Sequence, residues 1–324
     1  MTERQRLAPR LAHLRNRALA LDALRRFFAE RDFLEVETPL LVPSPGLELH
    51  LDAFPVADER SVQYLITSPE YQMKRLLAGG MERIYTVCKC FRRGEAGAHH
   101  NPEFTMVEWY RAPGHWREIA EDVIALCDAV RSAVRGAKAD LSWHFLTVAE
   151  AMHEFARIEC LGDEPAETLA ARGREAGWPV PETLTAWDDV FFSIFLAAID
   201  PGLASGPPTI LHDWPAPLAA LARLAPDDPR VAERFEAYAD GLELANGFGE
   251  LVDPAEQRVR FECELAARRQ RGLPTYPIDE RFLDALGEGI PPAAGVALGF
   301  DRLVMWASGA ASVREVSTFA HDEL

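Results

Sequence analysis

The sequence predicts an α+β protein built on an antiparallel β-sheet that helices flank. Its β-rich stretches follow one another as hairpins, as at 84–91 and 104–110, whereas a doubly wound parallel sheet would place a helix after each strand. Helical patterns are concentrated near the start, in the middle and near the end. The phosphate-binding patterns GxxxxGK[ST] and GxGxxG are missing, so we expect a nucleotide to be held in another way.

The first elements follow from spacing and turn residues. Apolar residues recur at helical spacing over 7–28, which predicts a long amphipathic helix that ends near Arg31. The alternating stretch 33–38 predicts a strand, and Pro39 stops it, which fits a sheet edge or an interface. After a Pro/Gly loop, 62–66 reads as another strand.

The next elements form the most informative part of the chain. Ser68-Pro69-Glu70 has the residues of a helix start, and Gly79-Gly80 ends that helix. The two strands 84–91 and 104–110 are separated by a polar, glycine-containing loop over 92–103. We therefore expect an antiparallel hairpin with a long functional loop.

The second half is assigned by the same rules. Residues 118–226 alternate helical stretches with loops, and 141–226 is interpreted as a helical insertion in one domain that spans 1–324. Strand-like character returns at 234–251, a charged amphipathic helix is expected at 254–271, and 296–306 joins a strand to a helix.

Composition narrows the classes of function. The chain has 34 basic and 51 acidic residues and a formal charge of -17, which opposes broad binding to nucleic acid or to an anionic membrane. A tRNA partner is thus unlikely without a local basic patch. The start lacks the apolar core of a signal peptide, and the apolar run 190–198 is too short to cross a bilayer. We expect a cytoplasmic protein whose five scattered cysteines are reduced.

The strongest chemical signal is the string from Phe91 to Tyr110. Arg92 at the strand end can grip a phosphate and a carboxylate oxygen, and Phe104 offers a face for a purine. Glu108 and Tyr110 share one face of the second strand and could receive an ammonium group. The alternative is a surface hairpin with a charged tip and Phe104 in the core.

A second signal is the acidic stretch 241–251. Glu243 and Glu250 flank Asn246-Gly247, and a tight bend there would let both carboxylates converge on one magnesium ion. An ordinary acidic hairpin is an equally good explanation of this stretch.

Two weaker signals complete the set. In Gly295–Leu303, small residues allow a ligand to approach the backbone, and Arg302 could meet the base or the terminal phosphate of a nucleotide. Glu70 places a carboxylate in a first helical turn. A solvated arginine and simple complementation of the helix dipole are the alternatives.

Together these strings resemble the three signature motifs of class II aminoacyl-tRNA synthetases, and in particular the lysyl-tRNA synthetase catalytic domain. The stretch 33–39 is similar to motif 1, which forms dimers; 92–110, with HNPEFTM, is similar to motif 2; and 295–303 is similar to motif 3. Motif 1 begins too early to leave room for an anticodon-binding OB domain. The chain therefore resembles the free-standing elongation factor P lysyl ligase family.

The resemblance implies a set of site residues. Catalytic roles fall to Arg92, Glu243 and Arg302. The amino-acid substrate, lysine or β-lysine, would contact Ser68, Pro69, Glu70, Glu108, Tyr110, Glu250 and Ala297. ATP would contact Arg92, Arg93, Gly94, Glu95, His100, Asn101, Phe104, Glu243, Leu244, Gly299 and Arg302, and Mg²⁺ would contact Glu243 and Glu250.

Two positions depart from the synthetase pattern. Gly94 stands where an acid follows the motif 2 arginine, and a shift of one residue in the loop could let Glu95 supply that acid. Ala297 stands where α-lysine enzymes usually have glycine. The added methyl group would crowd an α-amino group but tolerate one on the β-carbon.

The resemblance implies a homodimeric, ATP-dependent ligase that forms AMP. The substrate carboxylate would attack the α-phosphorus of ATP and release pyrophosphate, with Arg92 and magnesium stabilising the developing charge. A lysine amine of elongation factor P would then attack the adenylate, forming an amide. The rivals are a truncated lysyl-tRNA synthetase that charges tRNA, a non-catalytic paralogue and an asparagine-synthetase-like enzyme.

Overall fold

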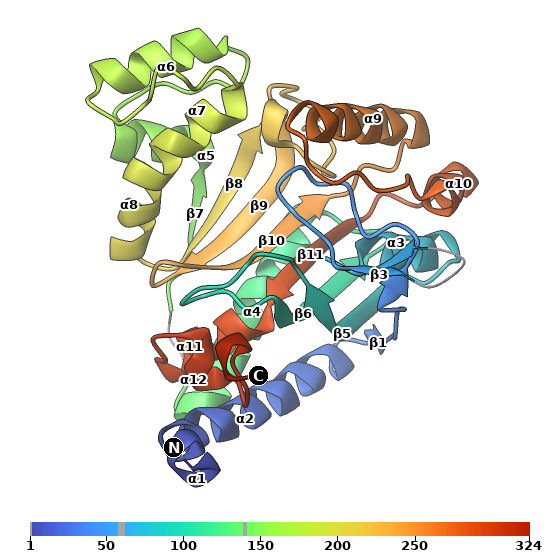
Figure 1. Cartoon of the computed structure of the whole chain (residues 1–324), viewed down its shortest axis with the longest axis vertical. Coiled ribbons are helices and arrows are strands. Elements are labelled where there is room, and N and C mark those ends of the chain that lie inside the picture. The colour runs from blue at the N-terminus through green and yellow to red at the C-terminus, as the bar shows by residue number, and fades with distance from the viewer. Residues whose placement is uncertain (1, 58–61, 139–140) are drawn as a thin grey trace. The chain divides into compact units, whose positions relative to one another are not determined.

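A computed structural model describes residues 2–57, 62–138 and 141–324 of the chain (Figure 1). The chain divides into two compact units. The larger unit comprises Met1–Ala139 and Leu251–Leu324, and the smaller unit comprises Asp140–Glu250. Each unit contains a mostly antiparallel set of strands together with helices, so the predicted α+β class is confirmed.

The sheet of the larger unit has the strand order β1-β5-β6-β11. Strands β5 (Arg83–Phe91) and β6 (Glu103–Arg111) form the predicted antiparallel hairpin, and β11 (Ala294–Gly299) pairs antiparallel with β6. The edge strand β1 covers only Leu34–Glu35 and runs parallel to β5. The predicted edge position is confirmed, although the strand is shorter than 33–38.

A second sheet of the larger unit has the order β2-β4-β3. It consists of β2 (Leu41–Val42), β3 (Pro55–Ala57) and β4 (Val62–Leu65). The helix α3 (Glu70–Ala78) follows and ends at the predicted Gly79. The helix begins one residue later than expected, at Glu70, and its N-cap is Pro69. The Ser68 hydroxyl accepts a hydrogen bond from the Glu70 amide at 3.1 Å.

The prediction of a single helix over 7–28 is wrong. The structure has α1 (Glu3–Leu7), a 3-10 turn η1 (Ala8–Arg10) and then α2 (Leu11–Ala29). Pro9 lies in the 3-10 turn, where its missing N–H interrupts the regular helical hydrogen bonds. The remaining helices of the larger unit are α4 (Trp116–Arg135), α9 (Pro254–Gln270), α10 (Glu280–Glu288), α11 (Phe300–Ser308), α12 (Val313–Val316) and the 3-10 turn η5 (His321–Glu323).

The smaller unit has the strand order β10-β9-β8-β7. Strands β8 (Thr209–Pro215), β9 (Val231–Ala239) and β10 (Leu242–Gly249) are antiparallel, and β7 (His144–Thr147) runs parallel to β8. Its helices are α5 (Val148–Ala151), α6 (Ala166–Glu175), α7 (Trp187–Ile194) and α8 (Asp200–Ser205), with π-helices η2 (Met152–Ala156) and η3 (Phe195–Ile199) and the 3-10 turn η4 (Ala216–Leu218).

The interpretation of 141–226 as a helical insertion is wrong in part, because the strands β7 and β8 lie within it beside the helices. Strand β8 is buried along almost its whole length, so it lacks the polar alternation that marks a half-buried strand. A short apolar run of this kind cannot be told from a helix by periodicity. The run 190–198 does lie in the helices α7 and η3 and contributes to the apolar core of this unit.

No helix within residues 2–57, 62–138 and 141–324 has both the length and the apolar content needed to span a membrane.

Candidate active site

Glu108 on β6 is the centre of a buried polar cluster in the larger unit. Its side chain accepts a hydrogen bond from the Tyr110 hydroxyl at 2.6 Å and another from the Ser68 hydroxyl at 2.9 Å. The residue is 1 % exposed. Burial, followed by the charge of Glu70, raises the pKa of Glu108 well above its usual range. Both donors are neutral hydroxyls, so a cationic ligand is the natural partner for this acid.

Ala297 on β11 lies directly opposite Glu108 in the strand register. It is partly buried and packs against an apolar cluster that includes Met106 and Phe104. Side chains at opposite positions of an antiparallel pair are about 5 Å apart at Cβ. The methyl group of Ala297 therefore borders the space beside the Glu108 carboxyl group.

Glu70 joins the same part of the unit, but it already has a partner. The Lys74 ammonium donates to its Oε1 atom at 2.5 Å, one helical turn along α3. Lys74 is only 1 % exposed. Lys74 was not predicted as a site residue, although its i,i+4 spacing from Glu70 is a signal that could have indicated it. This ion pair balances the charge of Glu70, so Glu108 is the acid of the cluster that remains for a cationic ligand.

Glu48 is a third acid of this cluster that the sequence analysis missed. Its Oε2 atom is buried and has no hydrogen-bond partner among the described residues, although the residue as a whole is half-buried. Burial, then the charge of Glu70, raises the pKa of Glu48 to about 7, and Glu264 acts in the same direction while Arg92 opposes it. Glu48 lies in the Pro/Gly loop after β2, where no local pattern marks it.

The loop over 92–103 carries the guanidinium group predicted to bind ATP. The Arg92 Cζ atom lies 5.1 Å from the centroid of the Phe104 ring, so the cation covers that aromatic face. The Nε atom of Arg92 is buried without a hydrogen-bond partner among the residues that the structure describes. Phe104 is partly buried and packs against the apolar cluster. Arg92 thus retains hydrogen-bonding capacity for an anionic ligand.

The next positions of the loop explain the departure at Gly94. Its φ of +88° lies in the left-handed region, which strains residues that carry a side chain. Glu95 follows, and its Oε1 atom lies 3.9 Å from Arg92 Nη1. An acid is therefore available beside Arg92 from position 95, and an acid at position 94 would strain the loop.

The predicted motif 3 arginine meets the same loop. Arg302 on α11 lies with its Nη2 atom 2.5 Å from His100 Nε2, and its Nε atom donates to the His99 carbonyl at 3.5 Å. Gly299 immediately precedes α11, and the three atoms nearest to a Cβ placed there all belong to the Arg302 side chain, at 3.8 Å. The residues predicted from two distant motifs are thus brought together, and the space beside Gly299 is open.

Arg93, predicted to contact ATP, contacts Asp52 in the loop that also carries Glu48. Its amide donates to the Asp52 carbonyl at 2.7 Å, and its Nη2 atom lies 3.4 Å from the Asp52 carboxylate. Arg268 on α9, which is fully buried, donates to Asp52 Oδ1 at 2.6 Å and to the Glu48 carbonyl at 2.7 Å. The same buried guanidinium therefore fixes the loop of Glu48 and the acid that binds Arg93.

In the smaller unit, the expected bend at Asn246-Gly247 is wrong. Both residues lie inside the continuous strand β10, and the turn lies earlier, at Asp240-Gly241. The pairing of β10 with β9 has a register shift between Glu243 and Ala245 and continues through Asn246 and Gly247. The bend that was expected to bring Glu243 and Glu250 together is therefore not at Asn246-Gly247, and their joint binding of one magnesium ion stays a prediction.

Glu236 is an acid whose pKa the charge of Glu243 raises, although its register partner on β10 is Asn246. It lies on β9, hydrogen-bonded to Arg234 and to the Tyr238 hydroxyl, each at 2.5 Å. Burial raises the pKa of Glu236 to about 7, with the Glu243 charge acting in the same direction. The predicted site residue Leu244 is buried on β10, so only its backbone could contact a nucleotide. The hairpin pairing of β9 and β10 was the signal that could have indicated Glu236.

Comparison with known proteins shows the family to which the chain belongs. The chain matches the family "tRNA synthetases class II (D, K and N)" over residues 6–323, and it belongs to that family. It is also similar to proteins named elongation factor P–(R)-β-lysine ligase. It is 39% identical over 318 residues to those of Salmonella paratyphi A and Klebsiella pneumoniae subsp. pneumoniae, with 96% of each chain covered.

Proposed function

We propose that this protein is an ATP-dependent ligase that activates (R)-β-lysine as an adenylate and transfers it to a lysine side chain of elongation factor P. The similarity to ligases of that name over nearly the full chain supports this proposal. The observation that carries it is the buried carboxyl group of Glu108, which Ser68 and Tyr110 hold in place opposite Ala297. We also propose the cytoplasm as its location.

The acidic cluster suits a substrate with two ammonium groups. Glu108 and the Oε2 atom of Glu48 are buried, and the charge of Glu70 raises the pKa of both acids. Binding of a cation would favour the ionised carboxylates and relieve their repulsion. Ser68 and Pro69 complete this side of the pocket, and Glu250 of the smaller unit remains a proposed contact of the substrate.

The loop over 92–103 and the start of α11 form the proposed ATP site. Arg92 would bind the α-phosphate and the substrate carboxylate together, because a guanidinium can donate to both in one plane. His100, Asn101 and Arg302 would contact the other phosphates, and Phe104 and Glu95 the adenine. Gly299 leaves room for the nucleotide beside the backbone.

Two chemical steps follow from this arrangement. Arg92 would hold the substrate carboxylate in line with the α-phosphorus, so that a carboxylate oxygen forms a bond to phosphorus as the bond to pyrophosphate breaks. A lysine amine of the acceptor would then attack the adenylate carbonyl, lose a proton and release AMP. Glu243 and Glu250 are the acids proposed to hold magnesium, which would neutralise phosphate charge.

The test combines two measurements on the purified chain. ATP–pyrophosphate exchange with (R)-β-lysine should exceed exchange with α-lysine, and intact-mass analysis of elongation factor P should show one added lysyl group. Absence of exchange with either amino acid would favour a non-catalytic paralogue. Exchange with an unshifted acceptor mass and charged tRNA would favour a truncated lysyl-tRNA synthetase.

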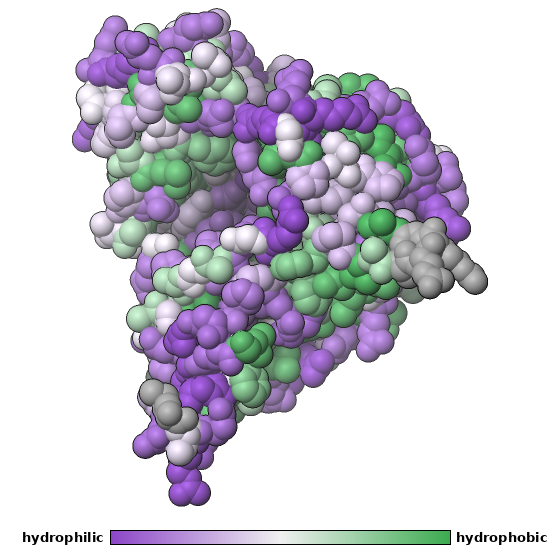
Figure 2. Space-filling view, viewed as in Figure 1, coloured by the Kyte–Doolittle hydropathy of each residue, from purple (hydrophilic) through white to green (hydrophobic). Residues whose placement is uncertain are grey.

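We further propose that the chain forms a homodimer through the segment that resembles motif 1. Large apolar side chains in this segment and directly after it are exposed, at 55 % for Leu34, 38 % for Leu40 and 41 % for Leu41. Val56 on β3 is 41 % exposed. Figure 2 shows apolar surface gathered over β1, β3 and β5. A second copy that covers this surface would remove it from water.

A further inference from the structure

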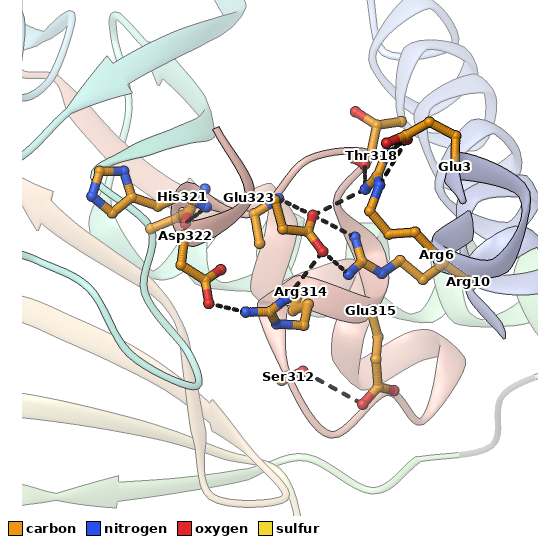
Figure 3. Close-up of polar contacts among 12 residues, drawn as sticks. Glu3, Arg6, Arg10, Ser312, Arg314, Glu315, Thr318, His321, Asp322 and Glu323 are labelled. Atoms are coloured by element: carbon orange, nitrogen blue, oxygen red, sulfur yellow. Dashed lines mark hydrogen bonds and ion pairs between the residues drawn. The ribbon is translucent and has the colours of Figure 1, made fainter. Parts of the chain in front are cut away.

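A carboxylate near the end of the chain, that of Glu323, is surrounded by guanidinium groups (Figure 3). Its side-chain oxygens accept hydrogen bonds from Arg6 Nη1 at 3.0 Å, Arg10 Nη1 at 2.9 Å and Arg314 Nη1 at 3.0 Å. The side chain is 11 % exposed. The hydrogen bond from Arg10, followed by that from the Ala320 amide, lowers the pKa of Glu323 to about 2. The group is therefore ionised throughout the physiological range.

These contacts join segments that are far apart in the sequence. Arg6 lies in α1, Arg10 in η1 and Arg314 in α12. Arg6 also donates to the Thr318 carbonyl at 2.8 Å. We call the set of Arg6, Arg10, Arg314 and Glu323 the terminal clasp. It fixes the segment 313–323 against the first helical turns of the chain.

The segment that the clasp fixes also holds the loop over 92–103. The Val313 amide donates to the Ala98 carbonyl at 2.8 Å, and the His321 amide donates to Asn101 Oδ1 at 3.2 Å. Ala98 and Asn101 lie on either side of His99 and His100 in the loop. The loop residues that meet Arg302 are therefore tethered on both sides by residues of 313–321.

We propose that Glu323 is a positioning residue for ATP: through the terminal clasp it holds the amides of Val313 and His321 where they fix the loop over 92–103. The inference rests on the proposed function, in which His100 and Asn101 of that loop contact ATP. Among the described residues, Glu323 hydrogen-bonds to Arg6, Arg10, Arg314 and the Ala320 amide, which all lie outside the loop over 92–103. A loop fixed before binding does not have to lose conformational freedom when the nucleotide binds, so its release weakens ATP binding.

Loss of the carboxylate has a specific electrostatic consequence. In Glu323→Gln, the guanidinium groups of Arg6, Arg10 and Arg314 remain close together without their common counter-charge, and like charges repel. Asp322 offers a matched control, because it is adjacent, 66 % exposed and pairs with Arg314 alone. Asp322→Asn removes the same formal charge and leaves the clasp in place.

Hydrogen exchange tests the coupling without reference to activity. In Glu323→Gln, the peptides covering 92–103 and 313–321 should exchange at least 5-fold faster than in the wild type, while Asp322→Asn should match the wild type. Arg10→Gln breaks the clasp from the other side and should behave like Glu323→Gln, so the test does not depend on the folding of one variant. Unchanged exchange in 92–103 would overturn the proposal.

Kinetics separate positioning from a general loss of structure. We expect the KM for ATP to rise about 5- to 10-fold in Glu323→Gln, with kcat and the KM for the amino acid within 2-fold of the wild type. An equal rise in both KM values, or a fall in kcat alone, would overturn the proposal. If the wild type itself shows no ATP–pyrophosphate exchange, the proposed function fails, and the hydrogen-exchange result still decides whether Glu323 holds the loop.

Discussion

At the scale of single residues, Glu48 shows how burial beside a second acid changes the charge of a carboxyl group. Its pKa is raised to about 7, whereas that of a free glutamate is about 4.5. Between these values the folded chain binds more protons than the unfolded chain, so the free energy of unfolding falls as the pH rises. Glu236, whose pKa is also raised to about 7, adds to the same trend.

Glu48→Gln removes one of these titrations. The free energy of unfolding of the variant should exceed that of the wild type by about 1–3 kcal/mol at pH 8 and match it near pH 4, because the wild-type carboxyl group is then protonated in both states. Urea unfolding at the two pH values measures this. The exposed Glu37 gives the control Glu37→Gln, which should leave the pH dependence unchanged. An equal change at both pH values would contradict the assignment.

The same charge change should appear in substrate binding. Because the ionised form of Glu48 attracts an ammonium group, kcat/KM for the amino acid should rise as the pH increases through about 7. Glu48→Gln should lower kcat/KM roughly 10-fold at pH 8, as expected for loss of a charge-assisted contact. It should also abolish the rise with pH. A variant that retains the rise would assign it to another group.

Ala297→Gly tests the selectivity of the pocket. Ala297 lies opposite Glu108, so removal of its methyl group should create space for an amino group on the α-carbon. We expect the ratio of kcat/KM for α-lysine to that for (R)-β-lysine to increase about 10-fold, the usual effect of one methyl group in a pocket. ATP–pyrophosphate exchange with each isomer measures the ratio. An unchanged ratio would remove Ala297 from the basis of selectivity.

At the scale of elements, Arg268 ties α9 to the loop that carries Glu48 and Asp52. Its guanidinium donates to the carbonyls of Glu48, Leu49 and Leu51 as well as to the Asp52 carboxylate. These acceptors belong to a loop without regular backbone pairing over 48–52. The hydrogen bonds from this one buried guanidinium group therefore hold the loop in place, as strand pairing would hold a segment of a sheet.

Arg268→Met should destabilise the chain by about 3–5 kcal/mol, because it leaves the Asp52 carboxylate and several carbonyl groups without their buried donor. Thermal unfolding measures this change. Arg269→Met is the matched control, since Arg269 is the exposed neighbour on the same helix and its replacement should cost less than about 0.5 kcal/mol. Similar losses for both variants would contradict the role of Arg268.

At the scale of the whole molecule, the exposed apolar segment around β1 predicts an assembly. Leu34→Arg places a charge on the surface proposed to face a second copy, so the dimer should dissociate at micromolar concentration. Light scattering coupled to size-exclusion chromatography gives the mass in solution. Leu196→Arg, at a residue that is 64 % exposed in the smaller unit, is the control and should leave the mass unchanged. A monomeric wild type would contradict the dimer.

The sequence alone determined the hairpin of β5 and β6, the edge position of β1 and the helix that ends at Gly79. It also indicated Arg92, Glu108 and Arg302. These features depend on residue periodicity and turn residues, which act over a few positions of the chain. Strands such as β8 were not predicted, because a strand that is buried on both faces lacks the alternation of polar and apolar residues.

Only the tertiary structure decided which charges meet. Glu48 lies in a loop and Glu70 at the start of α3, and the charge of Glu70 still acts on Glu48. Arg268 contacts residues more than 200 positions away, and the charge of Glu243 on β10 acts on Glu236 on β9. Such contacts are fixed by the packing of whole elements, and no local pattern encodes their distances. Burial then alters the pKa of each acid, because the charged form loses its water.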